Sequence, residues 1–236
     1  MKYIYLLFLI LLAAGCNQKT EQLFDGRTFE GWRGYDRSDV PGAWSIEAGA
    51  LKVNGARPGD TLRDGGDLIF AAKKFKDFEL ELEWKISEGG NSGIHYLGQE
   101  VEGQPLYISA PEYQVLDNEN HPDAQYGIAG NRQAASLYDM IAADPQNTLP
   151  YGAWNKTRIV VKDKHVAHYQ NGEKVLEYRL GTPEWETMLN NSKFGSERWP
   201  EAFRLMIRCG EEPGYIGLQD HGDDVWFRNI TVRELN

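Results

Sequence analysis

Alternation of apolar and polar residues is the main pattern of this 236-residue chain. The clearest case is Phe78–Ile86, FELELEWKI, in which every second residue is apolar and the residues between are charged. A period of two places these two sets on opposite faces of a β-strand. Similar short runs, separated by Gly-rich turns, occur at residues 44–47, 49–53, 67–70, 156–161, 164–169 and 204–208. The pattern predicts an all-β fold, an antiparallel two-sheet sandwich.

Four segments refine this prediction. Asn171–Gly172 is typical of a two-residue hairpin turn, and Pro183–Asn191 is the one stretch with clear helical character. The segment from Ile128 to Tyr151 is long, polar and irregular, and loops of that length are often functional. In the tail, apolar runs at 215–218 and 225–227 flank a His-Gly-Asp-Asp turn, which predicts a hairpin.

Composition narrows the class of protein. Hydrophobic residues make up 41% of the chain, which suits one core and a single domain over residues 23–236. The formal net charge is −10, and an acidic chain is a poor partner for nucleic acid, whose phosphates require clustered Lys and Arg. A neutral or polar small molecule fits this composition better.

The N-terminus has the pattern of a bacterial lipoprotein signal. Lys2 precedes an apolar run, and Ala13, Ala14 and Gly15 precede Cys16. This predicts a signal peptide over residues 1–15, lipidation of Cys16 and a tether over residues 16–22. The alternative, a transmembrane anchor, is disfavoured because the run is shorter than the roughly 20 residues that span a bilayer. We therefore expect a protein of the bacterial cell envelope, bound to the membrane through its N-terminal lipid only.

The second cysteine, Cys209, has no partner for an intramolecular disulfide if Cys16 is lipidated. It follows an alternating run and is expected to be a small buried residue rather than a nucleophile. No CxxC or HxxxH spacing occurs, so the sequence does not predict a structural zinc site.

Several predicted strands carry mixed polar residues on one face, unlike the uniformly charged face of FELELEWKI. Directional hydrogen-bonding groups of this kind suit a sugar. If these strands are neighbours, the following residues form one polar cleft: His95, Glu112, Gln114, Arg208, Gln219 and His221. Gly217 would leave room beside them. Asp117, at the end of the strand of Glu112, is a further candidate for contact with the substrate, although it could instead fix a turn. Glu112 could instead pair with Arg208 across strands, and His168 is expected at an exposed strand position.

Five segments resemble the 3-keto-disaccharide hydrolase domain family. They are GNSGIHY, PEYQVLD, YGAWNKTRIVV, VAHYQNGEKV and GYIGLQDHGDDVWFRNITVREL. The resemblance extends over residues 22–235, and the last segment is its most specific part. It implies a concanavalin A-like jelly roll and an enzyme that cleaves 3-keto-glycosides. It also implies that residues 129–150 and 185–203 are insertions that shape the pocket.

The chemistry of such a substrate sets the groups that the protein needs. A ketone at C3 acidifies the C2 proton, so a base can remove it, the enolate can expel the C1 substituent, and water can add back. The resemblance implies His221 or His95 as base and Glu112 as its partner or as acid. Arg208, Gln114 and Gln219 would then contact carbonyl and hydroxyl oxygens. A divalent metal ion held by His and carboxylate oxygens is a possible substitute for the enolate donor.

Two other functions stay open. A non-catalytic carbohydrate-binding module can use the same fold, because fold does not fix function. An ordinary glycosidase would need two carboxylates, for which Glu112 and Asp117 are the candidates. Their spacing of five places them on opposite faces of an uninterrupted strand, so a bend would be needed between them.

Overall fold

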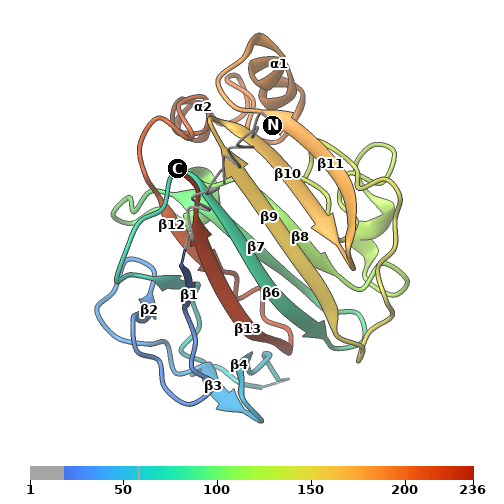
Figure 1. Ribbon diagram of the computed structural model, residues 1–236. Coiled ribbons are helices and arrows are strands. Elements are labelled where there is room, and N and C mark those ends of the chain that lie inside the picture. Colours follow the sequence, from blue (N-terminus) through green and yellow to red (C-terminus); the bar gives the residue numbers. More distant parts are fainter. Residues whose placement is uncertain (1–18, 58) are drawn as a thin grey trace, which may run out of the picture.

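The computed structural model describes residues 19–57 and 59–236 and has two antiparallel sheets packed face to face (Figure 1). The larger sheet has the order β11-β10-β9-β6-β13-β4-β3, with β1 paired to β13. Its strands are β1 (Thr20–Gln22), β3 (Trp44–Glu47), β4 (Ala50–Val53), β6 (Phe78–Ile86), β9 (Asn155–Lys162), β10 (His165–Gln170), β11 (Glu173–Arg179) and β13 (Val225–Glu234). The smaller sheet has the order β2-β5-β12-β7-β8 and consists of β2 (Trp32–Gly34), β5 (Leu68–Phe70), β7 (Asn91–Gly98), β8 (Glu112–Leu116) and β12 (Tyr215–Leu218). The predicted two-sheet sandwich is confirmed.

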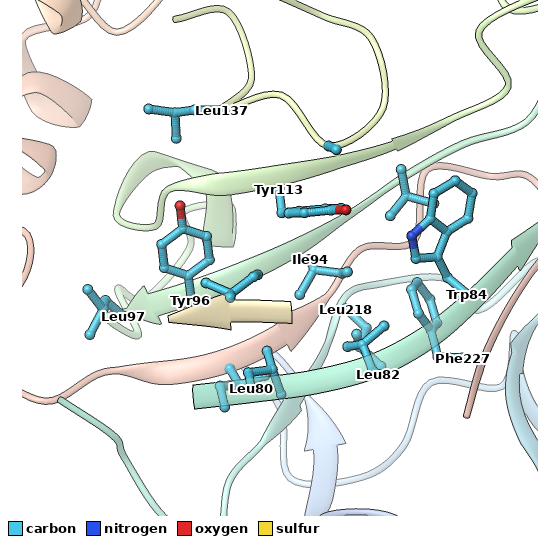
Figure 2. Close-up of a cluster of buried hydrophobic side chains, with 14 of the residues drawn as sticks. Leu80, Leu82, Trp84, Ile94, Tyr96, Leu97, Tyr113, Leu137, Leu218 and Phe227 are labelled. Atoms are coloured by element: carbon cyan, nitrogen blue, oxygen red, sulfur yellow. The ribbon is translucent and has the colours of Figure 1, made fainter. Parts of the chain in front are cut away.

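The core lies between the two sheets because the apolar residues of each strand point inward with a period of two. Figure 2 shows Leu80 and Leu82 of β6 facing Ile94 of β7 and Tyr113 of β8. All four side chains are buried. The charged residues of β6 point outward, as FELELEWKI predicts, and pair with basic side chains of β9 and β13.

Several local predictions are confirmed. The hairpin between β10 and β11 turns at Asn171 and Gly172, both with positive φ of 49° and 89°. α1 spans Pro183–Asn191, and Thr182 accepts a hydrogen bond from the Trp185 N–H at its start. The segment 128–151 is irregular apart from isolated bridges at Leu137, and Cys209 is buried. Burial raises the pKa of its thiol to about 12.

The predicted tail hairpin is wrong. β12 pairs with β5 and β7 in the smaller sheet, whereas β13 pairs with β4, β6 and β1 in the larger one. The intervening turn therefore crosses from one sheet to the other. Two ion pairs hold it, Arg63 with Asp220 at 2.6 Å and Arg57 with Asp224 at 2.9 Å.

The predicted strand at 204–208 is also wrong. Residues Pro200–Met206 form the short helix α2, with Pro200 in its first turn and Ala202 and Met206 buried one turn apart. A proline at the first helical position and an i, i+4 apolar pair favour a helix over a strand. α1 and α2 lie together at one end of the sandwich (Figure 1).

Two further elements are short 3₁₀ helices, η1 (Leu106–Ile108) and η2 (Pro122–Gln125). The predicted tether over residues 16–22 is shorter than expected, because Thr20–Gln22 pairs with β13 as β1. The predicted signal peptide and Cys16 lie outside the described residues. Within the ranges given above, no helix has the length and apolarity required to cross a membrane.

Candidate active site on the outer face of the smaller sheet

Three neighbouring strands bring four of the predicted residues together. Gly217 of β12 lies opposite His95 of β7, which lies opposite Glu112 of β8. In the next row the Gln219 N–H donates to the Gly93 carbonyl at 2.9 Å, and Gly93 lies opposite Gln114. Because side chains alternate along a strand, all of these residues point away from the core, to the outer face of the smaller sheet. We call His95, Glu112, Gln114 and Gln219 the polar cluster.

Gly93 creates the space into which the Glu112 side chain folds. A Cβ atom at Gly93 would lie 2.4 Å from Oε1 of Glu112, closer than two such atoms can approach. The Glu112 residue is 5% exposed, and its carboxylate has no hydrogen bond or ion pair to any residue that the structure describes. Burial raises the pKa of Glu112 to about 7, although the charge of Lys193 opposes this shift.

Gly217 has a different role from the one predicted for it. Cδ2 of Leu106 would lie 2.5 Å from a Cβ atom at this position. The room that the glycine leaves is therefore filled by a side chain of η1, which covers this part of the sheet.

His95 is fully buried between Gln219 and Glu112. Its Nε2 atom lies 3.5 Å from Nε2 of Gln219. Burial lowers the pKa of His95 to about 3, and the charge of Lys193 acts in the same direction. The ring is therefore neutral at physiological pH and can accept or donate one hydrogen bond at each nitrogen according to its tautomer.

Unpartnered polar atoms mark this face. Among the described residues, four buried side-chain nitrogen or oxygen atoms have no hydrogen-bond partner: Oδ1 of Asn91, Nδ1 of His95, Oδ1 of Asn147 and Oε1 of Gln219. Three of them come from β7 and the residue after β12, and Asn91 is in phase with Gly93 and His95 on the outer face. Buried polar groups are normally satisfied by protein, water or a ligand, so this row of atoms along β7 and the end of β12 is a candidate position for a polar ligand.

Gln114 has a mainly structural position. Its side-chain Oε1 accepts the Val115 N–H at 3.1 Å, and its backbone binds the loop through the Ala135 N–H and the Ser136 carbonyl. β8 is an edge strand, and this loop covers its open edge. Gln114 thus joins the polar cluster to the long segment 128–151.

Asp117 and His221 lie at the borders of the cluster. Asp117 accepts hydrogen bonds from the N–H groups of Gly89 and Glu119 and from the Asn120 side chain, so it fixes the turns at the end of β8. Although burial opposes the shift, these bonds lower its pKa. His221 is exposed beyond β12, and its ring centroid lies 6.5 Å from that of His121.

The structure does not place Arg208 in the polar cluster. It follows α2, its side chain is 74% exposed, and it pairs with Glu211 at 2.8 Å. It lines a hollow of about 210 Å³ with Leu97, Gln99 and Cys209 among other residues, none of which belongs to the cluster. The reason is the helix at 200–206, which removes the strand that was expected to align Arg208 with the cluster.

Sequence reasoning missed Asp67, a carboxylate at the edge of the site. It directly precedes β5 and accepts the Asp220 N–H at 3.0 Å. Burial raises its pKa to about 7, and its charge acts on Glu112. Asp67 is two residues before Ile69 and shares its outer face, because Leu68 and Phe70 point into the core. This alternation was the available signal in the sequence.

Lys193, between α1 and α2, was missed as well. Its ammonium lies over the rings of Tyr138, Phe194 and Tyr107, with distances of 4.3, 4.9 and 5.0 Å to the centroids. Burial lowers the pKa of Lys193, and the carboxylate of Glu112 is the largest opposing influence. The sequence offers no periodic signal here, although the insertion 185–203 was expected to shape the pocket.

A metal centre has no evident set of ligands. In the described part of the chain no three His, Cys, Asp or Glu side chains are grouped so that they could hold a metal ion. The possible divalent ion stays an untested prediction.

Comparisons with known proteins find relatives over most of the chain. Residues 19–233 match the model of the 3-keto-alpha-glucoside-1,2-lyase-like domain. A protein of Bacteroides thetaiotaomicron named 3-keto-disaccharide hydrolase is 58% identical over 226 residues, which cover 91% of this chain and 78% of the relative. A crystal structure from Parabacteroides distasonis, provisionally assigned as a glycosyl hydrolase, has a TM-score of 0.76 at 28% identity, covering 92% of this chain and 94% of that one.

A more distant structure supports the fold alone. A Bacillus subtilis protein of unknown function with a galectin-like fold has a TM-score of 0.51 at 15% identity, covering 92% of this chain and 94% of that one. The two-sheet jelly-roll class expected from the sequence is therefore confirmed.

Proposed function

Because the chain belongs to the 3-keto-alpha-glucoside-1,2-lyase-like domain family, we propose that it is a glycoside-cleaving enzyme that acts on 3-keto-disaccharides. The name of the Bacteroides relative, 3-keto-disaccharide hydrolase, supports this substrate class. The observation that carries the proposal is the chemical nature of the unpartnered atoms. The unpartnered oxygens of Asn91 and Gln219 are hydrogen-bond acceptors, the ring nitrogen Nδ1 of His95 can accept or donate according to its tautomer, and a sugar is a dense set of hydroxyl donors.

Glu112 is the best candidate for the base that removes the C2 proton. A base works best when its pKa lies near the working pH, and burial places the pKa of Glu112 at about 7. His95, with a pKa of about 3, is a weak base and serves as a neutral hydrogen-bonding neighbour. The family resemblance implied His221 or His95 as base and Glu112 as partner or acid, so this proposal moves the role of base to Glu112.

Asp67 is the corresponding candidate for the acid. Its pKa of about 7 leaves a useful protonated fraction at neutral pH. Gln219 follows β12, the strand between the strands of Asp67 and His95. A substrate above Gln219 can therefore face Glu112 on one side and Asp67 on the other.

The reaction balances with these groups. Glu112 takes the C2 proton, and the electron pair of the C2–H bond forms the enolate of the C3 ketone. The enolate then restores the carbonyl and expels the C1 oxygen, which takes a proton from Asp67. Water adds to the resulting enone, with oxygen at C1 and a proton at C2, so the net reaction is hydrolysis. An ordinary inverting glycosidase also uses an acid and a base, but its base activates a water molecule, whereas the base proposed here removes the C2 proton.

The test is hydrolysis of 3-keto-trehalose beside unoxidised trehalose, with and without a chelator. We expect glucose release from the keto sugar only, with kcat/KM rising toward pH 7 as Glu112 ionises and falling above it as Asp67 loses its proton. Cleavage of trehalose itself would contradict the elimination mechanism. Binding of both sugars without turnover would identify a carbohydrate-binding module, and loss of activity with chelator would establish a metal requirement.

We also infer that Cys16 carries a lipid that holds the enzyme in the bacterial envelope. The apolar run and the small residues before Cys16 support this proposal. The full chain is expected in the membrane fraction of expressing cells and the Cys16→Ala variant outside it. Equal fractionation of the two forms would contradict lipid anchoring.

A further inference from the structure

The outer face of the smaller sheet lacks one group that the proposed reaction needs. An enolate oxygen requires a donor or cation, and the residue expected to supply it, Arg208, pairs with Glu211 outside the polar cluster. Gln219 and Asn91 each present a free carbonyl oxygen to the site, which repels an enolate. A cation from another element is therefore needed.

Hydrogen bonds of the two flanking residues and of its own N–H fix the backbone at Lys193. The hydroxyl of Ser192 donates to the Leu189 carbonyl at 2.8 Å and accepts the Phe194 N–H at 3.1 Å. The Lys193 N–H donates to Oδ2 of Asp139 at 2.7 Å. Because Ser192 and Phe194 are both buried, the backbone that carries the lysine is fixed before any substrate binds.

The Lys193 amine is surrounded by aromatic rings and has no carboxylate partner among the described residues. The rings of Tyr107, Tyr138 and Phe194 surround it, and aromatic faces stabilise the protonated form of an amine. No carboxylate of the described residues lies within ion-pair distance of its Nζ. Asp123 and Asp139, whose charges act on Lys193, are both paired with Arg132.

The charge of this ammonium acts on both central residues of the cluster. It is the largest charge effect on Glu112, where it favours the carboxylate, and on His95, where it favours the neutral ring. The geometry agrees, because the Tyr138 N–H donates to the Glu112 carbonyl at 3.1 Å and the Lys193 ammonium lies 4.3 Å from the centroid of the Tyr138 ring. A cation beside the base is also beside the carbon from which the base takes a proton.

We propose that Lys193 is a further catalytic residue, whose ammonium binds the C3 oxygen of the keto sugar and stabilises the enolate. The proposal rests on the function proposed above. The electron pair released from C2–H moves to the C3 oxygen, and the ammonium compensates the new charge by a hydrogen bond without giving up its proton. No covalent bond to the lysine forms.

The test compares Lys193→Met with Lys85→Met on 3-keto-trehalose. Lys85 is the matched control, because its ammonium also lies over an aromatic ring, 4.3 Å from the centroid of Trp226, but on the larger sheet. Removal of one preorganised oxyanion donor costs about 10² to 10³ in kcat. We expect that loss for Lys193→Met with little change in the affinity for unoxidised trehalose, and no loss for Lys85→Met. Lys193→Arg should recover part of the rate.

A second readout separates catalysis from folding. Loss of the positive charge disfavours the Glu112 carboxylate, so the acid limb of kcat/KM should move to higher pH in Lys193→Met and stay in place in Lys193→Arg. The thermal midpoint of each variant shows whether it is folded. If Lys193→Met is unfolded, Lys193→Arg is used for the test instead.

The outcomes distinguish the two proposals. If the unchanged enzyme cleaves the keto sugar and Lys193→Met retains its rate within about threefold, the role of Lys193 is overturned and the proposed function stands. If borohydride traps a sugar on Lys193, a covalent imine replaces the charged donor and this proposal is overturned. If the unchanged enzyme does not cleave the keto sugar, both proposals fail.

Discussion

The two sheets have outer faces of opposite character, although both are rich in polar side chains. On the larger sheet, Glu79 pairs with Arg158 and Arg233, and Glu83 pairs with Arg228. On the smaller sheet, Glu112 has no partner among the described residues, and buried atoms of Asn91, His95 and Gln219 are unpartnered. Paired charges at a solvated face complete the fold by themselves. Unpaired groups at a buried face obtain their partners from water or from a ligand.

The largest expected effect comes from neutralising one glutamate on the outer face of each sheet. Glu112→Gln removes the proposed base, and we expect the rate on 3-keto-trehalose to fall by about 10³ or more, within the range that a positioned base contributes. Glu83→Gln should leave the rate unchanged and cost at most about 1 kcal/mol, as an exposed ion pair does. Equal rates for the two variants would refute the assignment of the active face.

Stability as a function of pH should differ between the same two variants. The pKa of Glu112 is raised from 4.5 to about 7 on folding, so its contribution to stability is fully present below about pH 4.5 and is lost as pH rises through 7. At about 1.4 kcal/mol per pKa unit the loss reaches up to roughly 3 kcal/mol. Urea unfolding at pH 5 and pH 8 should show that Glu112→Gln gains stability relative to the unchanged enzyme at the higher pH.

Glu83→Gln is the control for that measurement, since its stability difference should be nearly constant between pH 5 and pH 8. A difference for Glu112→Gln that is equally constant would mean that the buried carboxyl has an ordinary pKa. The account of Glu112 as base would then lose its electrostatic support.

Two glycines of the same face sharpen the comparison further. Ala at position 93 would push against the Glu112 carboxylate, whereas Ala at position 217 would push against Leu106. We expect Gly93→Ala to reduce kcat by about 10² because it displaces the base from its place. Gly217→Ala should instead lower the thermal midpoint, because overpacking a core contact costs about 1–3 kcal/mol. Steady-state kinetics and calorimetry on both variants measure these effects. A loss of kcat in Gly217→Ala and a loss of stability alone in Gly93→Ala would contradict the account.

The smallest expected effect concerns two buried glutamines. Gln170 accepts the Tyr113 hydroxyl at 2.8 Å and bonds Thr148, whereas Oε1 of Gln219 is unpartnered. Gln170→Leu should destabilise by about 1–3 kcal/mol because its partners lose their bonds. Gln219→Leu should be neutral or stabilising and should raise KM for the keto sugar about tenfold. Destabilisation of similar size in both would argue that Gln219 is structural.

The sequence predicted the faces of individual strands better than their neighbours. The period of two placed Glu79 and Glu83 on one face of β6 and separated His95 and Glu112 from the core, because side-chain direction is a local property of a strand. The choice of sheet is not local. The tail therefore looked like a hairpin, although β12 and β13 belong to different sheets.

Residues outside regular strands could not be predicted in this way. The run 204–208 is short and its apolar residues fit either period, so Arg208 was placed on a strand. Lys193 lies in a connection where only the folded chain brings it near Glu112. His168 was expected to be exposed, but it is buried between the sheets, with its ring bonded to the Tyr96 hydroxyl at 2.7 Å. These positions depend on tertiary packing rather than on spacing.

The most direct test of the account is a crystal structure of the Glu112→Gln variant soaked with 3-keto-trehalose. We predict that the sugar lies on the outer face of β7, β8 and β12, with hydroxyl groups within hydrogen-bonding distance of Asn91 Oδ1 and Gln219 Oε1. Sugar density in another place, with those atoms still unpartnered, would contradict the central claim that this face is the active site.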